Sequence, residues 1–372
     1  MIKGKSSKEE VYVPKVKYRE LDALNQSMIK IFDTDPVEFY KQFKLGKGKK
    51  EKISPSLIIG SVVDFFILSC KGNEEVFHNR FDEKFVLYGG AKGSGQVFTL
   101  ADILFELTKR DREDGKLKGS FENRFSEAVR IIQSDGKYKN KTEEQILDDF
   151  EKKGMEYFTL LVDNMDKIVV DTSLIDKSMV VGNMLRFDDF TRDVLKFDEI
   201  ATEDVEVLTH LPIQWVYTLL NGGEVECKSE VDLLIIDHNN QKVYLYDLKT
   251  NYDNESFDFS YVKNSYYLQA GFYYMAVKSW MKDNGLEDYE LERMKFIVAD
   301  TSKNNRRPLI YSTSEDDLKG SLDGFKLRGA YYRGVKELIE EIAWCEKKDL
   351  WNCSKESYDN MGQMKLKINY EG

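Results

Sequence analysis

Residues 228–250 read KSEVDLLIIDHNNQKVYLYDLKT and contain two apolar segments separated by a polar turn at Asn239-Asn240. Asp232 precedes the first apolar segment, and the second ends in Asp247-Leu248-Lys249. Runs of apolar and aromatic residues on both sides of an Asn-rich turn are typical of a β-hairpin. Charges beside core strands are costly unless they are compensated, and a divalent cation can compensate carboxylates. The stretch therefore predicts two paired core strands that hold a metal-binding pair of acids.

The residues at the end of the second strand, Asp247-Leu248-Lys249, are of the types that metal-dependent hydrolysis uses. Asp232 and Asp247 offer the oxygen ligands that Mg²⁺ and Mn²⁺ prefer, and the carbonyl of Leu248 could complete the set. Lys249 lies on the same strand face as Asp247, because side chains repeat every two residues, and could orient water. The alternative is a surface hairpin with ordinary solvated charges.

Composition sets the class of protein. The chain has 372 residues, of which 41% are hydrophobic and 13% aromatic, which indicates one elaborated globular domain or two domains. The net charge of −11 argues against a protein that coats nucleic acid indiscriminately, but a local basic groove stays compatible with it.

The sequence shows no clear targeting segment and no recognisable cysteine motif. No apolar run is long enough to span a membrane and the start lacks a signal-peptide core, so we expect a cytoplasmic protein with no membrane partner. The four cysteines match neither a zinc motif nor an iron–sulfur cluster and predict reduced structural thiols.

The order of segments predicts an α/β protein with a mixed central sheet flanked by helices. We expect N-terminal helices of the core in 1–74, a mostly helical insertion in 75–200, and the sheet with its flanking helices in 201–372. Within the last part, one helix is predicted near 260–283 and a long one over 322–348. Ser27 is the expected N-cap of the first helix.

Five segments together resemble the PD-(D/E)XK nuclease superfamily, and most closely its RecB-like and RecE-like exonuclease branch from bacteria and phages. They are a Ser-capped helix before a Pro-containing turn, a helix motif of the form Gly-Ser/Thr-x-x-His, two metal-binding strands and a Gln-xxx-Tyr helix. In this sequence they are 26–40, Gly60-Ser61-Val62-Val63-Asp64, Lys228–Asp232, Asp247–Thr250 and Gln269–Tyr273.

The resemblance implies a restriction-endonuclease-like fold and a Mg²⁺- or Mn²⁺-dependent DNA nuclease. It implies metal ligation by Asp64, Asp232, Asp247 and the Leu248 carbonyl, a catalytic role for Lys249, and support from Gln269 and Tyr273. The leading reading is a RecE-like exonuclease of DNA recombination or repair that acts on duplex ends. Candidate partners are further copies of the chain and a single-strand-annealing protein. The alternatives are an endonuclease against phage or foreign DNA, and a degenerate member that binds DNA or a recombination partner without cutting.

The sequence departs from the family pattern at two positions. Asp64 stands where the family helix has His, and aspartate is a harder ligand that favours Mg²⁺. Related exonucleases place a glutamate on the strand before Asp232, where the nearest position here is the neutral Gln214, with Glu206 and Glu230 as candidate substitutes.

A basic, glycine-containing segment precedes the Asp64 helix. Its lysines are expected to contact DNA phosphates without sequence preference, and a solvated loop is the alternative. They are Lys41, Lys44, Lys47, Lys49, Lys50 and Lys52.

Overall fold

A mixed β-sheet contains the predicted hairpin. The computed structural model describes residues 21–47, 54–89, 95–113, 120–304 and 306–364. The hairpin strands are β4 (Glu224–Asp237) and β5 (Lys242–Asn251), which pair antiparallel from Leu233↔Tyr246 to Asp237↔Lys242. The turn at Asn239-Asn240 is confirmed, and Gln241 beside it takes a left-handed φ of 52°.

Further strands extend this sheet on both sides in the order β3-β4-β5-β7-β8, with β6 pairing the start of β5. β7 runs parallel to β5, whereas the other neighbours along this order are antiparallel. The predicted mixed sheet flanked by helices is therefore confirmed. The added strands are β3 (Val205–Thr218), β6 (Glu290–Leu291), β7 (Lys295–Asp300) and β8 (Leu309–Ser312).

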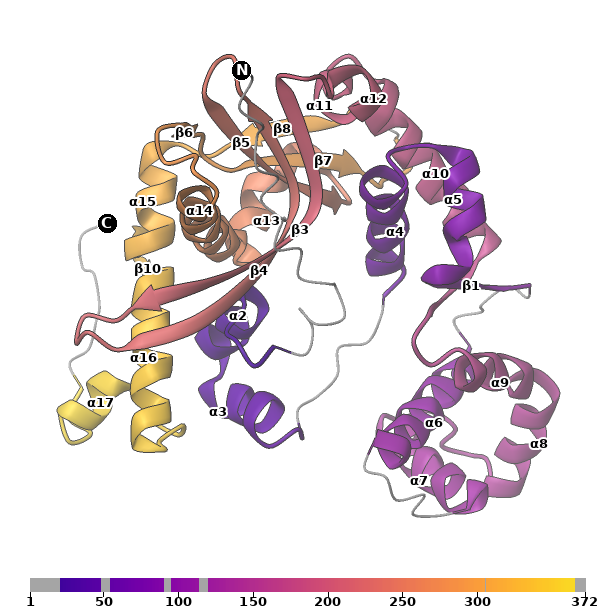
Figure 1. Ribbon diagram of the computed structural model, residues 1–372. Helices are drawn as coiled ribbons and strands as arrows, with labels where there is room; N and C mark the ends of the chain where they lie inside the picture. The colour runs from indigo at the N-terminus through magenta and orange to yellow at the C-terminus, as the bar shows by residue number, and fades with distance from the viewer. Residues whose placement is uncertain (1–20, 48–53, 90–94, 114–119, 305, 365–372) are drawn as a thin grey trace, which may run out of the picture. The chain divides into compact units, whose positions relative to one another are not determined.

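β3 and β4 form a long hairpin in register from Val205↔Asp237 to Thr218↔Glu224. Gly222 makes its turn possible, because its φ of 81° is strained for residues with a Cβ. Figure 1 shows this hairpin as the long curved pair of strands beside helix α14.

A helical connection carries the chain from β5 to the parallel strand β7, as parallel neighbours require. It consists of a short turn, η4 (Asn254–Ser256), then α13 (Phe257–Lys263) and α14 (Tyr266–Asp283). The single helix predicted at 260–283 is thus two helices. Ser265, at the break, has a left-handed φ of 52°, which a continuous right-handed helix does not allow.

The core of the sheet lies against α14 and two other helices. Phe272 of α14 packs edge-on against Trp215 of β3, with ring centroids 5.0 Å apart, and Ile29 of α2 and Leu338 of α16 are fully buried in the same cluster. Burying these side chains is the main favourable contribution to folding in this region.

The first N-terminal helix begins two residues earlier than a Ser27 cap would place it. Asn25 caps α2 (Gln26–Thr34) by accepting from the Met28 N–H, so the prediction of Ser27 as the cap was wrong. Asn and Ser are equally good caps, and the sequence offers both at this helix start. Asp35 then caps α3 (Pro36–Phe39), which continues as the π-helical turn η1 (Tyr40–Lys44).

The C-terminal region differs from the prediction of one helix over 322–348. A β-hairpin interrupts that range, and Gly324 before it has a φ of 91° that ends the preceding helix. The elements are α15 (Glu315–Asp323), β9 (Phe325–Leu327), β10 (Ala330–Tyr332), α16 (Val335–Lys348) and α17 (Lys355–Asp359).

The chain divides into two compact units. The first comprises 1–53, 67–72 and 181–372 and holds the sheet, and the second comprises 54–66 and 73–180. The predicted helical insertion, 75–200, overlaps the second unit over 75–180. Helix α10 (Thr172–Phe187) contributes residues to both units, as does the helical run of α4 (Pro55–Asp64) and η2 (Phe65–Ser69). In the first unit, α11 (Arg192–Leu195) and α12 (Phe197–Ile200) lead to β3.

The second unit is mainly helical. Its core includes Leu104 of α6, Ile132 of α7, Phe150 of α8 and Tyr157 of α9. A short parallel strand pair, in which Phe85 faces Ile168, adds a small sheet to the region predicted as mostly helical. The elements beyond α4 are α5 (Glu74–Arg80), η3 (Phe81–Glu83), β1 (Phe85–Tyr88), α6 (Gln96–Glu113), α7 (Phe121–Ser134), α8 (Glu143–Lys153), α9 (Met155–Asp163) and β2 (Ile168–Asp171).

Across the described residues, no individual helix has both the length and the apolar character needed to cross a membrane. One sharply bent pair, Pro55–Ser69 with Glu74–Glu83, meets these criteria by length and composition alone.

Candidate functional site

The two predicted acids meet where β4 and β5 separate. The strand pairing ends at Leu233↔Tyr246, and one residue further along each strand come Asp232 and Asp247. The Leu248 N–H donates to Asp232 Oδ2 over 3.0 Å, so a side chain takes the place of the next backbone acceptor. The end of the strand pairing thereby ties Asp232 to the backbone beside Asp247.

Asp247 is the most enclosed acid of the site, with none of its surface exposed. Its Oδ1 accepts a 2.6 Å hydrogen bond from Gln269 Nε2, on helix α14. Its Oδ2 forms an ion pair with Lys249 Nζ, but no hydrogen bond from a described residue has acceptable geometry at that oxygen. A buried carboxylate oxygen with one ionic neighbour retains the capacity to bind a cation.

Lys249 is the positive group of the site, with a side chain that is 17% exposed. Burial by itself would lower the pKa of Lys249, but the carboxylates of Asp247 and Asp232 outweigh this effect and raise the pKa. The ammonium also lies 5.2 Å from the centre of the Tyr266 ring. Lys249 is therefore held as a charged group beside both acids.

The orientation of the Leu248 backbone follows from its hydrogen bond. Its N–H points toward β4, because it donates to Asp232. The N–H and C=O of one strand residue point to the same side of the strand. The carbonyl of Leu248 therefore also faces β4, at a point beyond the last β4–β5 pair, where it can serve as a ligand.

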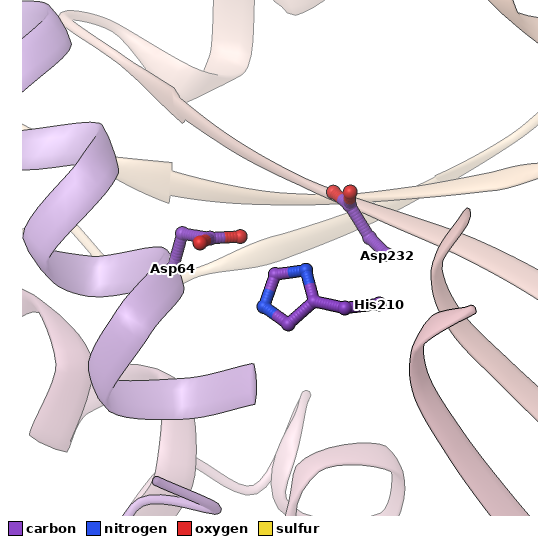
Figure 2. A group of neighbouring side chains, drawn as sticks. All are labelled: Asp64, His210 and Asp232. Atoms are coloured by element: carbon purple, nitrogen blue, oxygen red, sulfur yellow. The ribbon is translucent and has the colours of Figure 1, made fainter. Parts of the chain in front are cut away.

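His210 of β3 joins the site from the other side of β4. The pairs Thr209↔Leu233 and Leu211↔Val231 place His210 directly across from Asp232. A ring nitrogen of His210 and a carboxylate oxygen of Asp232 lie within 4.8 Å of one another, and Figure 2 shows the two side chains as neighbours. Sequence reasoning did not include this histidine.

Two neighbours orient the His210 ring. Ser69 Oγ lies 3.1 Å from Nε2, and Glu230 Oε1 lies 3.4 Å from Nδ1. The backbone of His210 has a left-handed φ of 50° in the middle of a strand, which is uncommon for a residue with a Cβ. Strain of this kind is frequent at functional sites, where the surrounding structure maintains it.

Asp64, which Figure 2 also draws, is the last residue of α4 and belongs to the second unit. Within that unit, Lys84 Nζ lies 3.5 Å from its Oδ2. The helical structure continues from Asp64 through η2 to Ser69, whose hydroxyl contacts His210. The proposed role of Asp64 as a metal ligand stays a prediction.

Gln269 and Tyr273 occupy different surroundings although they lie one turn apart on α14. Gln269 contacts Asp247 directly, as described above. Tyr273 is 6% exposed and packs within the hydrophobic core of the sheet. The predicted supporting role of Tyr273 at the site stays a prediction.

The three positions considered for the family glutamate differ in their distance from the candidate site. Gln214 lies opposite Lys228 and approaches Glu226, with its Nε2 3.4 Å from Oε2. Glu206 contacts His238 over 3.1 Å at the open end of the β3–β4 hairpin, beside the pair Val205↔Asp237. Only Glu230, beside His210, lies next to the candidate site among these three residues.

The predicted DNA-binding lysines are described in part. Lys44 forms a 2.5 Å ion pair with Glu346, and Lys47 follows η1. Lys49, Lys50 and Lys52 lie outside the described residues. The role of this segment in DNA binding stays a prediction.

The sequence gives only a weak indication that His210 belongs to the site. It is one of three histidines, and it stands in the strand-like segment between Val205 and Ile213. Its approach to Asp232 depends on the register of the β3–β4 hairpin, which the segment itself does not define.

The site thus combines Asp232, Asp247, Lys249 and Gln269 with Glu230, a candidate from the sequence, and with His210, which the structure adds. No protein-family model matches this chain, and no curated protein matches it.

Proposed function

We propose that the protein is a divalent-metal-dependent DNA nuclease, and specifically a RecE-like exonuclease that acts on duplex ends in recombination or repair. The observation that carries the proposal is the buried Asp247 carboxylate, which Gln269 and Lys249 hold next to Asp232. These residues come from three of the segments on which the resemblance to PD-(D/E)XK nucleases rests.

The residues present fit Mg²⁺ or Mn²⁺. Three carboxylates, of Asp232, Asp247 and Glu230, are accompanied by the ammonium of Lys249, which leaves a formal charge of −2 when His210 is neutral. Excess negative charge in a partly buried site is costly unless a cation neutralises it. The Asp247 Oδ2, whose ionic partner is Lys249, and the Leu248 carbonyl are oxygen donors of the kind that hard cations prefer.

Asp232, Asp247 and the Leu248 carbonyl would hold the cation, which supplies Lewis-acid stabilisation of phosphate charge and lowers the pKa of water. Gln269 fixes the orientation of the Asp247 carboxylate through Oδ1, and Oδ2, the partner of the Lys249 ammonium, would contact the cation. The Leu248 N–H does the same for Asp232. Lys249 contributes positive charge where the phosphodiester gains negative charge, and it orients the attacking water.

The test uses linear and covalently closed circular duplex DNA with Mg²⁺, Mn²⁺ or a chelator. We expect the protein to degrade the linear DNA alone and only when a metal ion is present. Asp247→Asn replaces the carboxylate with an amide of similar shape, and we expect this variant to lose the activity. Glu224→Gln is the matched control, because Glu224 lies on β4 at the exposed far end of the hairpin.

Cutting of closed circles would assign the protein to endonucleases instead. Binding of DNA ends without cutting, with either metal, would favour the alternative of a degenerate family member that binds DNA but does not cleave it. An Asp64→Asn variant in the same assay tests the predicted ligand role of Asp64, and unchanged activity would remove it from the ligand set.

A further inference from the structure

The strand histidine next to Asp232 points to a property of the site beyond the proposed reaction. We propose that His210 is a nitrogen ligand of the bound cation, so that the site selects Mn²⁺ or another transition-metal ion over Mg²⁺. This inference rests on the proposed function for its biological meaning, although metal binding itself can be measured without DNA.

The first argument is position. The hairpin register sets His210 across from Asp232, and a ring nitrogen lies within 4.8 Å of an Asp232 oxygen. Two donors at that separation can ligate one ion after small side-chain adjustments, since metal–nitrogen and metal–oxygen bonds are about 2.0–2.2 Å long.

The second argument is the orientation of the ring. Metal-binding histidines generally use their second nitrogen to contact a carbonyl, carboxylate or other polar group, which fixes the tautomer. Ser69 Oγ at 3.1 Å from Nε2 provides such a contact. Nδ1 then faces the acidic side of the site, since its described neighbour is the Glu230 carboxylate at 3.4 Å.

The third argument comes from a different residue. Asp247 is fully buried, and its Oδ2 has the Lys249 ammonium as an ionic partner but no hydrogen bond of acceptable geometry from the described residues. The Leu248 N–H, next to Asp247, is bonded to Asp232. The acid that faces His210 is thus linked through the backbone of Leu248 to a second carboxylate that is fully buried.

The ligand set determines the preference among metals. Mg²⁺ strongly prefers oxygen ligands, whereas imidazole suits transition-metal ions. A set with one nitrogen and several oxygens therefore lowers the relative affinity for Mg²⁺. This reverses the sequence-based expectation that aspartate at position 64 makes the site harder, because a softer donor enters from β3 instead.

The first experiment needs no variant. Pulsed electron paramagnetic resonance of the metal-free protein loaded with one equivalent of Mn²⁺ detects nitrogen bound to the ion. We expect a ¹⁴N coupling that changes when the protein is made with ¹⁵N-histidine. Bound Mn²⁺ without any histidine coupling would overturn the proposal.

The second experiment compares two histidines by calorimetric titration of Mn²⁺ and Mg²⁺. His210→Asn should weaken Mn²⁺ binding by about tenfold or more and Mg²⁺ binding much less. Asparagine is chosen because it tolerates the left-handed backbone at this position. His238→Asn, in the same hairpin, should leave both affinities unchanged.

An equal loss of both metals in His210→Asn, or an Mn²⁺ affinity unchanged by it, would contradict the inference. DNA cleavage separates this failure from that of the proposed function. DNA cleavage without a histidine coupling would support the nuclease proposal and reject His210 as a ligand. Histidine-bound Mn²⁺ without DNA cleavage would support His210 as a ligand and reject the nuclease proposal.

Discussion

One hairpin contains two histidine–glutamate pairs with different surroundings. His210 and Glu230 lie at the candidate site, with Nδ1 and Oε1 3.4 Å apart, and their side chains are 15% and 23% exposed. Glu206, near the open end of the β3–β4 pairing, and His238, just after β4, lie 3.1 Å apart, and the His238 and Glu206 side chains are 29% and 56% exposed. The same two residue types thus occur in a partly enclosed place and in an open one.

The difference between the two pairs lies in the charge of their further neighbours. His238 uses its other nitrogen to contact the Tyr289 hydroxyl over 2.9 Å, so a neutral phenol completes that group. His210 likewise contacts a hydroxyl, that of Ser69, with its other nitrogen, but it also faces Asp232, which the Leu248 N–H links to the strand segment of the buried Asp247. A histidine–glutamate pair therefore indicates a metal site only where buried carboxylates add negative charge that the protein does not neutralise.

The largest expected effect comes from removing that buried charge. Asp247→Asn should reduce metal-dependent DNA cleavage by more than about 100-fold, because even indirect supports of metal ligands cost up to that amount. Initial rates on linear duplex DNA measure it. Retained cleavage would mean that the two histidine–glutamate pairs differ in burial but not in function.

Lys249→Met tests the positive side of the site. It should destabilise the metal-free protein by about 3–5 kcal/mol at pH 7, because Asp247 loses its buried ionic partner. The acids raise the pKa of Lys249, so its contribution is complete below the unfolded pKa of about 10.4 and is lost as pH rises through the folded pKa. Urea unfolding with a chelator should show the difference from wild type shrinking above about pH 10.4, and a difference that grows there would refute this account.

The two histidines can be compared directly in the reaction. With Mn²⁺ near half-saturation, His210→Asn should lower the cleavage rate by about tenfold and His238→Asn by less than about twofold. Equal losses in the two variants would remove the distinction drawn between the pairs.

Gln269→Leu removes the donor to Asp247 Oδ1. A buried carboxylate that loses a hydrogen bond costs about 1–3 kcal/mol, which chemical denaturation without metal can measure. Gln214→Leu is the matched control, since Gln214 is exposed and its contact with Glu226 is 3.4 Å long. A similar change in both variants would indicate that Gln269 merely fills space.

The smallest effect is expected at the open pair. His238→Asn should change the free energy of unfolding by no more than about 1 kcal/mol, because partly exposed pairs contribute little. A larger loss in thermal or urea unfolding would show that the Tyr289 contact stabilises the hairpin more than its exposure suggests.

Much of the candidate site was predictable because its parts are close in sequence. Asp247, Leu248 and Lys249 are consecutive, and strand periodicity alone sets the lysine beside the acid. The Asn239-Asn240 turn then brings Asp232 to the neighbouring strand. The mixed sheet flanked by helices followed from the order of apolar segments.

Helix boundaries were less predictable for a local reason. Asn25 and Ser27 are both good caps, and the backbone breaks at Ser265 and Gly324 require unusual φ values that neighbouring residues do not signal. The predictions of one helix at 260–283 and one at 322–348 were wrong at these breaks.

The sequence by itself thus determined the acids, the lysine and the hairpin that carries them. Only the tertiary structure brought Gln269 to Asp247, 22 residues away, and His210 to Asp232. Both contacts depend on long-range geometry, namely the packing of α14 on the sheet and the register of β3 against β4. Register depends on the whole length of a strand pair, and a shift of one residue would turn His210 away from the acids.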